Sequence, residues 1–153
     1  MSNKNYSDSF KNRQSAEILR SVYRNAEMAY EASTDVLKHC RNAHLYNEIS
    51  AQRDRYRQVA GKMRSELNSR GVKPPQYSPY AKAMSKMGIA MKTMSDSSSS
   101  GLAALMLRGT TMGIIDMQHA VNRSAAAEQS IRSDAQELLA REQSFCDSLK
   151  RYL

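Results

Sequence analysis

The segment from Asp96 to Arg123, DSSSSGLAALMLRGTTMGIIDMQHAVNR, constrains the fold more than any other part of this 153-residue chain. Its apolar and small residues recur every three or four positions, which is the spacing of one buried helix face. They are Leu102, Leu105, Met106, Gly109, Met112, Gly113, Met117 and Ala120. Asp116 falls within this face, where a carboxylate is costly unless another group pairs with it. We therefore expect a core helix that carries one paired polar residue.

The rest of the chain also favours helix. Its three prolines all lie between positions 74 and 79, it has no Trp and few β-branched residues, and its apolar positions keep helical spacing. We expect a flexible N-terminal tail over residues 1–14 and a single domain over 15–153. Within that domain the periodicity predicts helices over residues 15–40, 45–70, 80–94, 96–123 and 124–152, with a linker over 72–79.

The lengths and connections of these helices predict an architecture. Residues 15–40 and 45–70 are joined by a tight turn, and so are 96–123 and 124–152, so each pair should form an antiparallel hairpin. The long connection between the hairpins contains the short helix 80–94. We therefore expect an all-α fold, a ferritin-like up-down four-helix bundle with one long crossover that contains a short extra helix.

Charge and hydropathy limit the classes of partner. The net charge is +8, and the excess lies in residues 1–98, which hold 17 Lys and Arg against 9 Asp and Glu. Such a surface can attract nucleic acid or other anions, so a basic-surface binder is one alternative function. No Lys/Arg block or aromatic platform supports it, and we expect solvated helix faces instead. No apolar run approaches a membrane span and no signal peptide begins the chain, so we expect a cytoplasmic protein with no membrane partner.

Four polar residues fall on the expected inner helix faces. Di-metal bundles place Glu residues and two Glu-x-x-His motifs there, because carboxylates and imidazoles hold two iron or manganese ions. This chain contains no Glu-x-x-His; it has Arg53-x-x-Tyr56 and Glu142-x-x-Phe145 instead. An arginine can bridge two carboxylates with its five donors. We therefore predict a core polar network of Arg53, Tyr56, Asp116 and Glu142 with no cofactor, in place of a metal centre.

A metal site remains the alternative. An atypical carboxylate site for iron or manganese, in an iron-handling protein or oxidase, would use Glu27, Glu31, Asp116 and Glu142. No nucleophile–His–acid set and no phosphate-binding glycine loop is recognisable, so we predict no catalytic residues and favour a protein that is not an enzyme.

A resemblance adds to this interpretation. The pattern K-x-M near Lys92–Met94, followed by LxxxMLRGTTMGIIDM at Leu102–Met117, resembles bacterial ferritin-like proteins of undefined function from Firmicutes and proteobacteria; its distinctive part is Arg108-Gly109-Thr110-Thr111. Many of those proteins have an acidic residue where this chain has Thr110. The resemblance implies the bundle fold and self-association. From the missing ligand set, and from Met and Tyr residues that could serve an interface, we expect a non-enzymatic dimer with a structural or a stress- or spore-associated interaction role.

Overall fold

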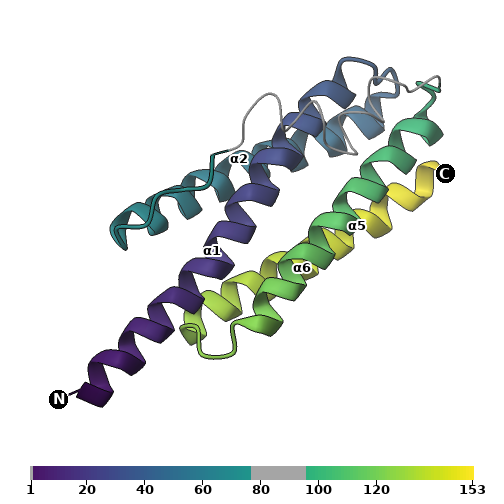
Figure 1. The fold of residues 1–153 in the computed structure, drawn as a ribbon. Coiled ribbons are helices and arrows are strands. Elements are labelled where there is room, and N and C mark those ends of the chain that lie inside the picture. The colour runs from purple at the N-terminus through teal and green to yellow at the C-terminus, as the bar shows by residue number, and fades with distance from the viewer. Residues whose placement is uncertain (1, 77–95) are drawn as a thin grey trace.

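The computed structural model describes residues 2–76 and 96–153 of the chain. In these residues it has four α-helices, a short 3-10 helix and no strand (Figure 1). The elements are α1 (Ser2–Leu37), α2 (Ala43–Ser69), α5 (Ser99–Arg123), α6 (Gln129–Leu149) and η1 (Lys150–Tyr152). The predicted all-α fold is therefore confirmed, and it is consistent with a four-helix bundle. The predicted short helix 80–94 lies outside the described residues.

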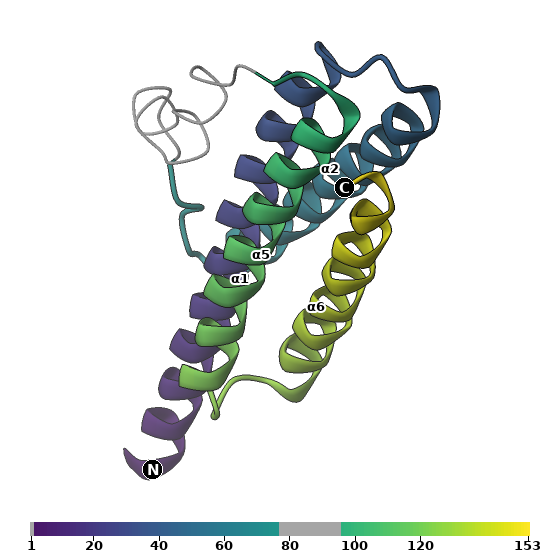
Figure 2. The same cartoon turned by 90° about the vertical axis from the view of Figure 1, so that its right-hand side faces the viewer.

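The helices form two antiparallel hairpins, and α1 packs along both α2 and α5 (Figure 2). Arg70, just after α2, binds Glu128, just before α6, so α2 ends where α6 begins. At the other end of the bundle, the Ser100 hydroxyl near the start of α5 bonds the carbonyl oxygen of Leu153. It follows that α2 and α5 run in the same direction and that their connection spans the length of the bundle.

The start of α1 differs from the flexible tail expected over residues 1–14. The helix begins at Ser2 and carries exposed Tyr6 and Phe10 in its first turns. The segment contains neither Pro nor Gly, so nothing in it interrupts a helix that the packed part of α1 has already nucleated. The side chains of Gln14 and Ser15 then accept hydrogen bonds from the backbone nitrogens of Ala126 and Glu128, at 2.7 and 2.9 Å.

The helix ends are set by local capping groups. Asn42 caps α2, where its side chain accepts a hydrogen bond from the Leu45 nitrogen, and Gly71 follows the helix with φ +68°. The Ser98 hydroxyl caps α5 by accepting from the Gly101 nitrogen.

Residues 124–128 were expected to belong to the last helix, but they form the turn between α5 and α6. Arg132 explains why the chain turns there. Its guanidinium donates to the carbonyl oxygens of Val121 and Ser124 at 2.9 and 2.8 Å, each of which also accepts a backbone hydrogen bond within the turn, and so it ties α6 to the end of α5.

Two apolar clusters fill the interior. The first occupies the half near the α5–α6 turn and includes Leu19, Val22, Met63, Leu67, Met117, Ile131 and Leu139. The second occupies the other half and includes Val36, Leu45, Ile49, Leu102, Met106, Phe145 and Leu149. On α2, Tyr56 is buried as predicted, whereas Arg53, which was also predicted to face inward, is partly exposed. On α5, Met112 was predicted to face inward but is 51% exposed. Thr110 is buried instead. It lies two positions before Met112, so its side chain points about 200° away from that of Met112 around the helix.

Candidate functional site

Glu142 is the one carboxylate that the described residues bury in the core, with 4% of its surface exposed. It lies on α6 between Leu139, which belongs to the first apolar cluster, and Phe145, which belongs to the second. The helical repeat turns all three toward the interior, because they are spaced three residues apart. The carboxylate therefore occupies the level that separates the two apolar clusters.

Both oxygens of this carboxylate are bound by α2. The Gln52 side-chain amide donates to Oε1 and the Tyr56 hydroxyl donates to Oε2, each at 2.8 Å. Gln52 and Tyr56 are one helical turn apart on α2, so they present their donors on the same face. Arg55 then donates to the Gln52 amide oxygen at 3.2 Å, and this bond links the buried group to a cation at the surface.

All four helices contribute a polar residue at this level. Buried Thr110 of α5 lies near the Tyr56 hydroxyl, where it acts to lower the pKa of Tyr56. Ser33 of α1, also buried, lies between the α1 residues of the two clusters and bonds the carbonyl oxygen of Ala29. We call Ser33, Gln52, Tyr56, Thr110 and Glu142 the polar layer. The side chains of Ser33, Gln52, Tyr56 and Glu142 bond to one another or to backbone, as buried polar groups require.

Burial changes the acid–base properties of the polar layer. Removal from water raises the pKa of Glu142 to about 7, although the hydrogen bonds from Tyr56 and Gln52 and the charge of Arg55 act in the opposite direction. Burial, followed by the nearby charge of Glu142, raises the pKa of Tyr56 well above its usual value. Near neutral pH, Glu142 therefore changes charge while Tyr56 stays protonated and able to donate.

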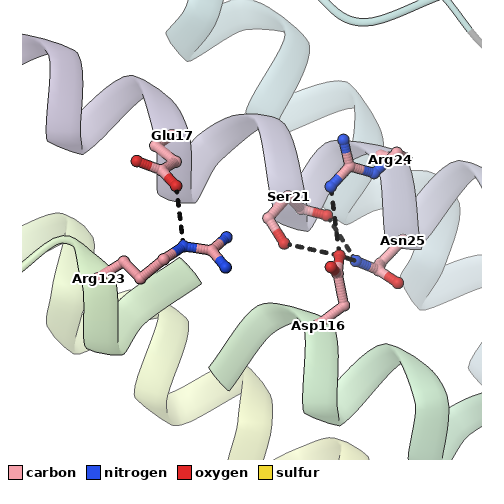
Figure 3. A network of polar contacts seen from close by, with 6 residues as sticks. All are labelled: Glu17, Ser21, Arg24, Asn25, Asp116 and Arg123. Carbon is pink, nitrogen blue, oxygen red and sulfur yellow. Dashed lines mark hydrogen bonds and ion pairs between the residues drawn. The ribbon is translucent and has the colours of Figure 1, made fainter. Parts of the chain in front are cut away.

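A second polar site joins α5 to α1 (Figure 3). Asp116 Oδ2 accepts hydrogen bonds from Asn25 at 2.7 Å, Ser21 at 3.1 Å and Arg24 at 3.3 Å. Partial burial raises the pKa of Asp116, but the three donors outweigh it and hold the pKa below the usual value. The Asp116 side chain is 44% exposed. This site is thus a half-buried clamp between two helices, and not part of the polar layer.

The two helices approach each other closely at this clamp. A Cβ atom added at Gly113 would lie 3.3 Å from the Asn25 side-chain oxygen. About two turns from Asn25 toward the N-terminus, Glu17 of α1 binds Arg123 of α5 at 3.3 Å, as Figure 3 also shows. The glycine therefore provides the room in which Asn25 can reach Asp116.

The four residues of the predicted network are consequently divided among three places. Tyr56 and Glu142 bind each other, Asp116 binds α1, and Arg53 bonds the carboxylate of its neighbour Asp54. The predicted Arg53 bridge between the two carboxylates is not formed. The reason is helical geometry: Gln52 occupies the inner face of α2, and Arg53 is rotated from it by about 100°.

The carboxylates of the alternative metal site are also apart. Glu27 of α1 lies 3.8 Å from the Arg64 guanidinium, Glu31 is partly buried on the same helix, and Asp116 and Glu142 bind different helices. In the described part of the chain, no three His, Cys, Asp or Glu side chains are grouped as a metal ion requires. The donor set of a di-iron or dimanganese centre is therefore not assembled there.

In comparisons with known proteins, no family model, no curated protein and no solved structure matches this chain. Within residues 2–76 and 96–153, no helix combines the length and the apolar character that a membrane span needs.

Sequence reasoning missed the partners of both carboxylates. Gln52 was not expected as a donor to Glu142, and Ser21 and Asn25 were not expected near Asp116. One sequence signal was available for the polar layer, because Gln52 and Tyr56 are polar residues one turn apart within an apolar stripe. No comparable signal marks Asn25, since its role depends on how α1 and α5 pack.

Proposed function

We propose that this chain is a non-enzymatic, ferritin-like bundle protein that acts by self-association, with the polar layer in the place of a di-metal centre. The observation that carries the proposal is that protein donors occupy both oxygens of Glu142, at 2.8 Å each. The ferritin-like assignment is supported by the parallel course of α2 and α5, which requires a long crossover between the hairpins.

The chemistry of the layer supports a structural role. A metal-bridging carboxylate needs free oxygen lone pairs directed at the ion and further carboxylates or imidazoles around it. Gln52 and Tyr56 offer an amide and a hydroxyl group, which satisfy the carboxylate but supply no anionic ligand. The layer is thus suited to fixing the register of the helices, as buried polar groups do in other bundles.

The self-association part rests on a pair of exposed apolar residues on α5. Met112 and Ile115 are each 51% exposed and lie three residues apart, on one outer face of the helix. If two copies of α5 pack antiparallel about a two-fold axis between these residues, Met112 of one copy meets Ile115 of the other. The face is therefore self-complementary, and a second copy of this chain is the partner that we propose for it.

Metal analysis tests the non-metal assignment. The purified protein is incubated with ferrous iron and with manganese(II), desalted and analysed for metal, beside the Glu142→Gln variant and the Asp116→Asn control. We expect less than one metal ion per chain in all three proteins. Stoichiometric metal in the natural protein that disappears in Glu142→Gln, but not in Asp116→Asn, would overturn the assignment and establish a metal protein.

Molar mass tests the self-association. Light scattering coupled to size exclusion should give twice the chain mass for the natural protein and the chain mass for the double variant Met112→Glu/Ile115→Glu. Gln118→Glu, an exposed substitution on the same helix, is the matched control and should stay dimeric. A monomeric natural protein would refute the role of this face.

A further inference from the structure

The N-terminal end of α1 forms one wall of a groove. The first turns of this helix run past the α5–α6 turn, where the sequence predicts a flexible tail (Figure 2). The end of α2 and the residues after it form the opposite wall, with Arg70 and Val72. The groove has a volume of about 910 Å³, within the range of roughly 300–1,000 Å³ that is typical of ligand clefts. The helical start of α1 therefore builds a concave surface that a flexible tail would not.

Two arginines of this groove lack a counter-ion. The charged residues of the lining are Asp8, Arg13, Glu17, Arg20 and Arg70. Arg70 and Glu17 are already neutralised, since each forms an ion pair with a residue outside the groove. Within residues 2–76 and 96–153, no ion pair involves Arg13, Arg20 or Asp8. The groove therefore presents two guanidinium groups without a counter-ion against one such carboxylate, and its local charge favours an anionic ligand.

Helical geometry places a tyrosine in line with these arginines. Tyr6, Arg13 and Arg20 are spaced by seven residues, which is almost two full turns, so they lie in one row along α1. Successive members of the row are about 10 Å apart along the helix axis, at a rise of roughly 1.5 Å per residue. The row exists only because the segment before residue 15 is helical. It was therefore not visible when that segment was expected to be a tail.

Aromatic rings are exposed at the start of this row. Tyr6 is 71% exposed and Phe10 is 40% exposed, and they lie one helical turn apart. The Arg13 guanidinium lies over the Phe10 ring, 5.7 Å from its centroid. Exposed aromatic rings and guanidinium planes are the surfaces on which proteins stack unpaired bases. The start of α1 thus joins a stacking surface to two cations.

We propose that this groove binds single-stranded nucleic acid, with phosphates at Arg13 and Arg20 and bases stacked on Tyr6 and Phe10. Stacking needs bases that are not enclosed in a duplex, which favours a single strand. The distance between the two arginines corresponds to about three nucleotides at the stacked spacing of roughly 3.4 Å. An acidic protein segment would pair with the arginines but would leave the exposed rings unused. This site is independent of the proposed self-association, which uses the outer face of α5.

The fluorescence anisotropy of a labelled oligothymidylate of about twelve nucleotides measures the binding. The natural protein is titrated between about 50 and 200 mM salt, and its affinity should fall as salt rises because phosphate contacts release counterions. Two contacts predict a slope of about −1.4 for the logarithm of the binding constant against that of salt. A natural protein that does not bind at the lower salt concentration would overturn the proposal.

Charge variants test the two arginines. Arg13→Gln/Arg20→Gln should bind at least about tenfold more weakly and lose most of the salt dependence. Arg141→Gln/Lys150→Gln removes the same charge from exposed side chains outside the groove and is the matched control, with less than about a twofold effect. Asp8→Asn removes the carboxylate without a counter-ion and should strengthen binding. An equal loss in the control would show that binding follows net charge alone, and would reject the groove.

A tyrosine variant and two other probes test the class of ligand. Tyr6→Ala should weaken binding of the oligothymidylate at least about fivefold through the loss of stacking, whereas Tyr46→Ala, on the exposed side of α2, should not. A labelled duplex of the same length and a labelled oligoglutamate should both bind more weakly than the single strand. If oligoglutamate binds as tightly, the groove is a site for an acidic protein segment instead. Equal binding of the duplex, with no effect of Tyr6→Ala, would refute the stacking of unpaired bases.

Discussion

The Tyr56 hydroxyl donates a 2.8 Å hydrogen bond to Glu142 Oε2 inside the core, and so joins two helices whose residues lie 86 positions apart in the chain. The bond does two things. It satisfies one oxygen of a buried carboxylate, and it fixes the register of α6 against α2, because Glu142 can reach this donor in only one vertical position of the helix. The stability of the bundle and its dependence on pH both follow from this pair.

Removing the hydroxyl should destabilise the fold. Tyr56→Phe keeps the ring and leaves one oxygen of a buried ionised group without its donor, which we expect to lower the free energy of unfolding by roughly 1.5–3 kcal/mol at pH 8. Urea denaturation followed by circular dichroism measures the change. Tyr46→Phe on the exposed side of α2 is the control, and we expect less than about 0.5 kcal/mol from it. Equal effects of the two variants would mean that the bond contributes nothing.

The unfolding free energy should fall as pH rises from about 4.5 to 7. The pKa of Glu142 is raised to about 7 in the folded protein, so in this range the folded state holds a proton that the unfolded state has released. The stability that Glu142 contributes is fully present below its pKa in the unfolded state and is lost by pH 7. The loss totals about 3 kcal/mol, because a difference of one pKa unit corresponds to about 1.36 kcal/mol.

The Glu142→Gln variant isolates this effect. Its side chain does not titrate, so the difference between natural and variant unfolding free energies should decrease across pH 4.5–7 and stay level above pH 7. A difference that is constant across the range would show that Glu142 has a normal pKa.

Asp116 should show the opposite dependence on pH. Its pKa is held below the usual value, so the folded state binds a proton less readily than the unfolded state does. The stability it contributes is present above its unfolded pKa and is lost as pH falls through the folded pKa. Asp116→Asn should therefore be less stable than the natural protein at pH 7 and approach it in strong acid, as measured by thermal unfolding. If Asp116→Asn is less stable than the natural protein by the same amount at low pH, the loss of stability comes from altered packing and not from the loss of the carboxylate charge.

The close approach at Gly113 should limit the size of the residue there. A Cβ atom would lie 3.3 Å from the Asn25 oxygen, so Gly113→Ala should displace Asn25 and weaken its bond to Asp116. The gain in helix propensity, about 1 kcal/mol, opposes this loss. We therefore expect little net gain in melting temperature from Gly113→Ala alone. Gly113→Ala is therefore also made in an Asn25→Ala background. The Asn25 side chain is then absent, so the full gain in helix propensity should appear as a higher melting temperature.

The helices of this protein could be predicted from sequence because helical periodicity is local. The inner face of α2 and the burial of Glu142 follow from apolar spacing within a single segment, and Gly71 and the serines near Ser98 mark helix ends by their own backbone preferences. The weakest local predictions were those without a strong pattern, such as the start of α1 and residues 124–128.

The partners of the polar residues were decided by the tertiary structure alone. Gln52 and Glu142 are 90 residues apart, and Asn25 and Asp116 are 91 apart. Which side chains meet across such distances depends on the rotation and vertical offset of whole helices, and those are set by how the two apolar clusters pack. A rotation of one residue, about 100°, separates Arg53 from the inner face that Gln52 occupies. The sequence by itself therefore determined that buried charge had to be satisfied, and the packing of the helices determined which groups satisfy it.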